Sequence, residues 1–236
     1  MSASSITRWI GIGLLGLPLY GALTFFSSLN PQPDPNTHPE AWARYVTTDF
    51  YLLKHLLASG LGIIFVIFGT ITLGVYLIRS RAGRLGLVGM VSAIFGTLLF
   101  LMVGGLSIFA APKQGQAILA GIEEYEKLPH ILADTALLPT MGVGVLLMLV
   151  GNVLLGVAVW RSGMLPRWAG ALWVAGSALP LLGTVYALAL DTQRTPPTVP
   201  MGAVLLVIGG AWIAWSVLRR PSAATAVGVG AQPRVQ

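Results

Sequence analysis

Six long apolar segments dominate this sequence, and no Asp, Glu, Lys or Arg lies in the middle of any of them. A helix of roughly 20 apolar residues crosses the hydrocarbon core of a bilayer. Because the segments are continuously apolar rather than alternating, helices are favoured over β-barrel strands. The sequence therefore predicts an all-α integral membrane bundle of six transmembrane helices, at approximately residues 7–28, 52–78, 85–110, 134–160, 168–189 and 199–218.

Charge is scarce along the whole chain. Only 9% of the residues are charged, whereas a soluble domain carries roughly 25%. We therefore predict one transmembrane domain, residues 1–220, followed by a small, polar and disordered cytoplasmic tail, residues 221–236. Arg8 precedes the first apolar run, as in a signal peptide, but Ile10–Phe26 is long for one and no small-x-small cleavage site follows. We interpret this run as a retained first span.

The charged residues predict the orientation of the spans. With the N-terminus inside, nine of the 14 Lys and Arg residues fall on the inner side and all eight Asp and Glu residues fall outside. Cytoplasmic loops carry the excess of Lys and Arg, so both termini are expected in the cytoplasm. The inner loops, 79–84 and 161–167, are short. The longer outer loops are expected to hold short helices, one from Pro39 and one at Gln114–Leu128.

Several classes of chemistry are excluded or lack a motif. The chain has no cysteine, which excludes disulfides, thiolate catalysis and Cys-ligated metal sites. No nucleophile–base arrangement, HExxH motif, phosphate loop or nucleotide fingerprint is present, so we expect a non-enzymatic role with no catalytic residue. Because the basic residues follow the span ends, the high pI of about 10.1 indicates membrane orientation and not nucleic-acid binding.

Two histidines at the outer ends of predicted spans can be interpreted as ligands. His55 and His130, on facing helices, would suit the iron of haem b, which makes a redox subunit one alternative function. The predicted depths of the two histidines in the membrane argue partly against joint ligation of one haem. His55 lies 24 residues from Arg79 and His130 lies 31 residues from Arg161, or about 36 and 46 Å of helix. A kink at Pro139 can change this difference, and histidines that bond only backbone or water are more common.

Asn152 is the most polar candidate within the membrane. A proton- or ion-coupled transporter usually keeps an ionisable group there, and the spans have none at their centres. A transporter or channel for a neutral or lipophilic solute remains a second alternative. Polar residues of this kind more often bond between helices or to their own backbone. The other candidates are Thr70, Thr72, Ser92, Thr97, Ser177 and Thr184.

Prolines and glycines within the spans carry information about packing. Pro18, Pro139 and Pro180 can kink their helices and open a cavity for a lipid-like or quinone-like ligand, or they can serve shape alone. Glycines permit close helix contact, within the chain or with a partner. Those considered were Gly11, Gly13, Gly16, Gly60, Gly62, Gly142, Gly144, Gly209 and Gly210.

A weak internal repeat relates two predicted hairpins. One opens at His55-Leu-Leu-Ala-Ser and turns after Arg79-Ser80; the other opens at His130-Ile-Leu-Ala-Asp and turns after Arg161-Ser162. Both would run from outside to inside and back, as parallel repeats do. Chance similarity between Leu- and Gly-rich helices is the alternative. The acidic stretch Glu123, Glu124 and Glu126 with Asp134 is interpreted as a solvated face.

The segment Arg161-Ser-Gly-Met-Leu-Pro-Arg-Trp-Ala-Gly170 resembles the R-S-x-x-L-P-R-W loop of small, uncharacterised bacterial multi-pass membrane proteins. The resemblance covers this loop and its flanking spans. It implies a bacterial plasma-membrane location and about six or seven helices, and it brings no activity or site residue with it.

The sequence thus favours a non-enzymatic membrane protein that binds a lipophilic ligand or a partner. The expected partners are membrane lipids, and other membrane subunits or further copies of the chain. The haem b subunit using His55 and His130, and the transporter with Asn152 on its path, stay open as alternatives.

Overall fold

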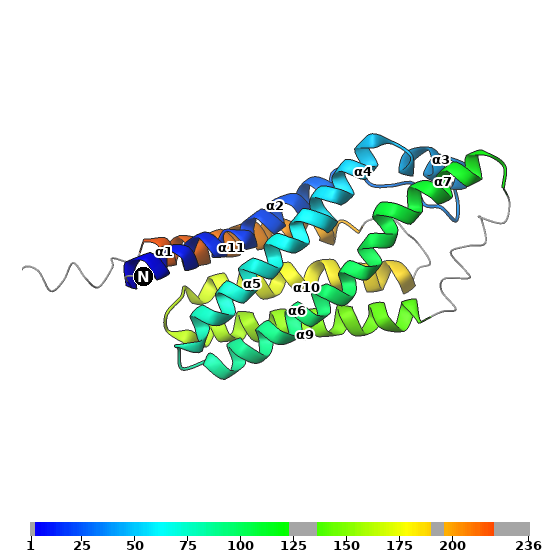
Figure 1. Ribbon diagram of the computed structural model, residues 1–236. Helices are drawn as coiled ribbons and strands as arrows, with labels where there is room; N and C mark the ends of the chain where they lie inside the picture. Colours follow the sequence, from blue (N-terminus) through cyan, green and yellow to red (C-terminus); the bar gives the residue numbers. More distant parts are fainter. Residues whose placement is uncertain (1–2, 123–135, 190–195, 220–236) are drawn as a thin grey trace, which may run out of the picture.

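A computed structural model describes residues 3–122, 136–189 and 196–219 of the protein (Figure 1). No strand occurs in these ranges, which confirms the predicted all-α class. The helices, two of them π-helical segments (η), are α1 (Ala3–Leu14), α2 (Gly16–Ser28), α3 (Pro39–Val46), α4 (Asp49–His55), η1 (Leu56–Gly62), α5 (Ile63–Ile78), α6 (Gly83–Gly105), η2 (Leu106–Ala110), α7 (Ala111–Leu119), α9 (Leu137–Ser162), α10 (Arg167–Ala189) and α11 (Thr198–Leu218).

Five helical stretches are long and apolar enough to cross a membrane. They are Arg8–Ser28, Asp49–Ile78, Gly83–Leu119, Pro139–Ser162 and Thr198–Leu218. Each coincides with one of the predicted spans, and most ends agree closely; the largest differences are the end of the third stretch, at Leu119 instead of residue 110, and the start of the fourth, at Pro139 instead of residue 134. The remaining predicted range, 168–189, forms α10, a helix of 23 residues that packs against both α9 and α11 (Figure 1).

The helix of the first predicted span is interrupted one turn before a proline, Pro18. α1 ends at Leu14 and α2 begins at Gly16, and Leu15 N bonds back to Ile12 O at 3.1 Å, the spacing of a tight turn. Pro18 has no N–H for the carbonyl of Leu14, so the regular hydrogen-bond ladder cannot continue across this point. The stretch nevertheless remains long and apolar enough to span.

The predicted short helix at Gln114–Leu128 is confirmed in part, because a helix, α7, covers residues 114–119 but begins earlier and ends at Leu119. Residues 114–119 belong to α7, which continues α6 through η2 as one stretch, Gly83–Leu119. Pro112 lies in the first turn of α7, where a missing N–H is tolerated. Gly115 packs against the backbone of Ala43 in α3, and this contact supports the extension. Residues 123–128 lie outside the described ranges.

The predicted helix from Pro39 is confirmed as α3. With α4 and α7 it forms the end of the bundle that we call the cap end (Figure 1). Its small core contains Trp42, Ala43, Val46 and Tyr51. On its surface Glu40 accepts a hydrogen bond from Arg44, one helical turn later, at 2.5 Å.

The opposite end, which we call the basic end, holds the turns of two hairpins. α5 and α6 are joined by residues 79–82, and α9 and α10 by residues 163–166. Both turns lie where α1 begins and α11 ends (Figure 1). The two hairpins therefore run in the same direction, as the internal repeat predicts. Gly163 adopts the left-handed conformation (φ 68°) that ends α9, which suits glycine.

Candidate functional site

A cavity of about 500 Å³ lies within the half of the bundle toward the cap end. Seven elements supply its walls: α2, η1, α5, α6, α9, α10 and α11. Its volume falls within the range of roughly 300–1,000 Å³ that is usual for small-molecule sites. Most of its lining residues are apolar, among them Ala58, Ile63, Val66, Ala93, Phe100, Met141, Val145, Met148, Leu181, Val185, Val199 and Leu206.

The polar lining of the cavity consists of hydroxyl groups, one carboxamide and one indole. Among the described lining residues none is Asp, Glu, Lys, Arg or His. A charged ligand would therefore meet no opposite charge in an apolar space, which is costly. The polar residues are Tyr20, Thr24, Ser27, Ser59, Thr70, Thr97, Asn152, Trp173 and Ser177.

Asn152 and Trp173 form a buried pair in the cavity wall. Trp173 Nε1 donates to Asn152 Oδ1 at 3.0 Å, and Asn152 Nδ2 donates to Met148 O at 2.8 Å. Because an indole N–H can only donate, the amide oxygen must face Trp173. One hydrogen of Nδ2 then has no acceptor among the described residues. That hydrogen is available to a ligand with a carbonyl, ether or hydroxyl oxygen.

The other polar candidates divide into two groups. Thr70, Thr97 and Ser177 line the cavity, so the sequence identified part of its polar wall. Thr72 and Ser92 do not line it, and Thr72 donates to its own helix at Phe68 O, 2.7 Å away. The side chain of Thr184 lies outside the described ones.

One of the three span prolines contributes to the cavity. Pro180 lies inside α10 and on the cavity wall. It packs so closely on α11 that a Cβ added to Gly202 would come within 2.5 Å of Pro180 Cδ. The ring has no N–H for the carbonyl of Gly176, which is also on the wall. Pro18 and Pro139 do not line the cavity.

The bundle is filled between the cavity and the basic end. A continuous apolar core occupies that half, with Leu14, Leu73, Leu77, Leu155, Val159, Ile213 and Val217 almost fully buried. Trp173, 1% exposed, belongs both to this core and to the cavity wall. In the described bundle the cavity therefore ends at the level of Asn152 and Trp173.

The two histidines proposed as haem ligands are not seen together. His55, at the end of α4, is half-buried; its Nδ1 lies 2.9 Å from Tyr51 O and its ring lies against the Tyr51 ring, centroids 4.0 Å apart. It does not line the cavity. His130 and the acidic stretch 123–134 lie outside the described ranges. Within those ranges no cluster of three or more potential metal-ligating side chains exists, and the haem pair stays a prediction.

A buried lysine at the cap end was missed by the sequence analysis. Lys54 is 5% exposed, and its Nζ donates to Asn30 O at 2.9 Å and to Tyr45 Oη at 2.5 Å. The Tyr45 hydroxyl in turn donates to Asn30 O at 2.9 Å. Burial raises the pKa of Tyr45, which keeps the phenol neutral and able to donate. Lys54 Nζ also lies 3.5 Å from Ser27 O in the last turn of α2, where a cation is electrostatically favourable.

No protein-family model matches this chain, and neither the curated proteins nor the solved structures compared with it give a match.

Proposed function

We propose that this protein is a six-span membrane protein that binds a neutral lipophilic molecule in the cavity between its helices. The observation that carries this proposal is the cavity itself, apolar over most of its wall and free of charged groups along its described lining. We propose a non-enzymatic role, with Asn152 as a binding residue.

The count of six rests on α10. Its 23 residues would span about 35 Å, more than the roughly 30 Å of a hydrocarbon core. With α10 as a span, both hairpin turns and both termini fall on one side. The described acids Asp34, Glu40 and Asp49 fall on the other.

The basic end is proposed to face the cytoplasm. The turns and helix ends there carry a large share of the basic residues, and cytoplasmic loops hold the excess of Lys and Arg. The bacterial plasma membrane is the proposed location, through the resemblance of the loop 161–170. The basic residues described at this end are Arg8, Arg79, Arg81, Arg84, Arg161, Arg167 and Arg219.

The chemistry of the wall defines the class of ligand. An apolar body would contact side chains such as Phe100, Val145 and Leu206. A polar group at one end would accept the remaining hydrogen of Asn152 Nδ2 and meet the hydroxyls of Thr97 and Ser177. A quinone-like or isoprenoid-like molecule with a carbonyl or hydroxyl head has this form.

Binding of such a molecule is favoured over its transport across the membrane, because close-packed apolar side chains separate the cavity from the basic end.

Native mass spectrometry of protein released gently from its membrane tests the proposal. We expect a bound neutral lipophile as added mass. Gly142→Phe should reduce its occupancy, because Gly142 lines the cavity and has open space beyond the position of a Cβ. Gly105→Phe is the matched control, since Gly105 also has open space but does not line the cavity.

Each possible result of this experiment leads to a different conclusion. Loss of the added mass in Gly142→Phe alone supports the cavity as the site. Equal retention in both variants places the ligand elsewhere and overturns the proposal, as does an empty wild-type protein. An added mass of haem with a Soret band would favour the redox alternative instead. The same spectrum reports a partner subunit or a homo-oligomer.

A further inference from the structure

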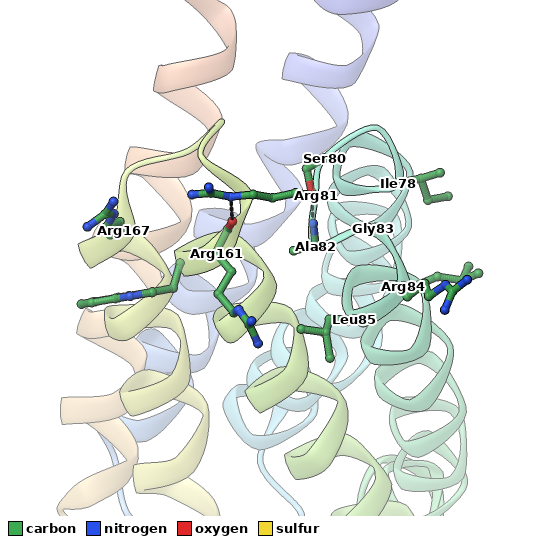
Figure 2. A pocket seen from close by; sticks show the side chains of 11 residues that line it. Ile78, Ser80, Arg81, Ala82, Gly83, Arg84, Leu85, Arg161 and Arg167 are labelled. Carbon is green, nitrogen blue, oxygen red and sulfur yellow. Dashed lines mark hydrogen bonds between the residues drawn. The ribbon is translucent and has the colours of Figure 1, made fainter.

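A second hollow, of about 850 Å³, lies at the basic end between the two hairpin turns (Figure 2). One wall is the α5–α6 turn and the other is the α9–α10 turn. We call it the arginine groove. Its lining consists of Ile78, Ser80, Arg81, Ala82, Gly83, Arg84, Leu85, Leu87, Trp160, Arg161 and Arg167.

Arg81 joins the two walls. Its side chain extends from one turn to the other, and its Nε donates to Arg161 O at 2.7 Å (Figure 2). Its guanidinium also lies beside the end of α9, with Nη2 3.5 Å from the place where a Cβ of Gly163 would be. A cation there satisfies a terminal helix carbonyl and the negative end of the helix dipole.

The other three guanidinium groups are available. Arg84, Arg161 and Arg167 have exposed side chains and no hydrogen-bond or ion-pair partner within the described chain. The groove lining contains no carboxylate. Several unpaired guanidinium groups lining one hollow favour an anion with several oxygen acceptors, such as a phosphate.

The apolar part of the groove indicates where that phosphate comes from. Ile78, Leu87 and Trp160 line it and are 49%, 44% and 39% exposed. Trp160 packs edge-on against Trp168, with ring centroids 5.2 Å apart. Aromatic side chains of this kind lie at the headgroup level of membranes. An anion with an attached hydrocarbon chain would contact both the arginines and these side chains.

We propose that the arginine groove binds an anionic phospholipid. Its phosphate headgroup contacts Arg161 and Arg167 on the α9–α10 side, and an acyl chain follows Ile78 and Leu87 into the bilayer, whereas Arg84 lies at the opposite edge of the groove (Figure 2). The lipid would bridge the two hairpins on the side where Arg81 already joins them. The groove is a site separate from the cavity, because the two share no lining residue.

The test compares lipid retention in nanodiscs of phosphatidylcholine containing a minor fraction of phosphatidylglycerol. Protein is then transferred to detergent and retained lipid is counted by native mass spectrometry. We expect wild-type protein to keep phosphatidylglycerol preferentially. Arg161→Gln with Arg167→Gln should reduce that occupancy by about tenfold or more, since each basic residue near an anionic surface contributes on the order of 1 kcal/mol.

The matched control removes the same charge from the same end. Arg79 and Arg219 cap α5 and α11, and neither lines the groove. Arg79→Gln with Arg219→Gln should keep the wild-type occupancy. An equal loss in both double variants would mean diffuse attraction by net charge and would overturn the proposal. If the double variant unfolds, Arg84→Gln alone tests the groove instead, and it should reduce phosphatidylglycerol occupancy by a smaller factor.

A third arm separates lipid from soluble phosphate. Millimolar inorganic phosphate or pyrophosphate is added to the detergent sample before the measurement. Phosphatidylglycerol should stay bound, because its acyl chain adds apolar contact that the free ions lack. Displacement by either ion, with that ion retained in its place, would make the groove a site for soluble phosphate and overturn the lipid assignment.

Discussion

Two buried polar residues show how this bundle accommodates groups that water would otherwise solvate. The side-chain oxygen of Asn152 accepts a hydrogen bond from the indole of Trp173, and its amide nitrogen donates one to the backbone carbonyl of Met148. Lys54 directs its ammonium at backbone carbonyls and a phenol. In both cases a buried polar group has partners, as low-dielectric surroundings require. Each pattern has a consequence for stability that can be measured.

Asn152→Leu should destabilise the fold by about 1 kcal/mol, because it leaves the indole N–H of Trp173 without its acceptor. Trp173→Phe leaves the amide oxygen unpaired in the same way. The double variant should lose less than the sum of the two single losses. A double-mutant cycle from reversible unfolding in mixed micelles measures the difference. Strict additivity would show that the hydrogen bond does not contribute.

Lys54→Met should cost about 1–3 kcal/mol, since the buried side chain no longer donates to the carbonyl of Asn30 and the Tyr45 hydroxyl. Lys113→Met is the control. Lys113 makes only a long surface contact, 3.5 Å to Gln116 Oε1, and its loss should change stability by less than about 0.5 kcal/mol. Similar unfolding midpoints for the two variants would contradict the role of Lys54.

At the level of helices, packing is set by glycines that bring backbones together. A Cβ on Gly151 of α9 would lie 2.2 Å from Ala93 N in α6, and one on Gly96 would lie 2.3 Å from Met148 N. Both were missed by the sequence analysis. Gly60 and Gly142, which it considered, have open space instead. A helix that is apolar on all sides gives no signal for which face packs, so composition alone could not separate these positions.

Gly151→Val should therefore be far more damaging than Gly142→Val. The first forces α6 and α9 apart along a backbone contact, and we expect a loss of about 1–3 kcal/mol or more. The second adds a side chain to open space, so stability should change only by about the helix-propensity difference, a gain of a few tenths of a kcal/mol for valine over glycine. Unfolding midpoints and the yield of monodisperse protein compare the two. A tolerated Gly151→Val would mean that the helices can separate without loss.

At the scale of the whole molecule, the sequence predicted the ranges of the helices much better than their arrangement. Hydropathy is a local sum over neighbouring residues, so the apolar runs located the five stretches that are long and apolar enough to span. The cavity depends on which helices are neighbours, and it joins Tyr20 with residues as distant as Leu206. Asn152 and the serine and threonine residues were recognisable as polar groups in apolar runs. Trp173, the partner of Asn152, carried no such signal.

The proposed topology can be tested with single introduced cysteines, because the chain has no native cysteine. Single cysteines can be introduced and probed in intact bacterial cells with a membrane-impermeant maleimide. With six spans and cytoplasmic termini, Asn36→Cys and Pro197→Cys should react in intact cells. Ser80→Cys and Arg219→Cys should react only after permeabilisation.

Pro197 and Arg219 decide the count of spans, because they lie at the two ends of α11. If α10 did not cross the membrane, Pro197→Cys would share the side of Ser80→Cys and Arg219→Cys would react in intact cells. If the orientation were reversed, all four cysteines would exchange behaviour together. The side of Pro197 therefore tests α10, and the side of Asn36 tests the orientation, so an error in one leaves the other measurable.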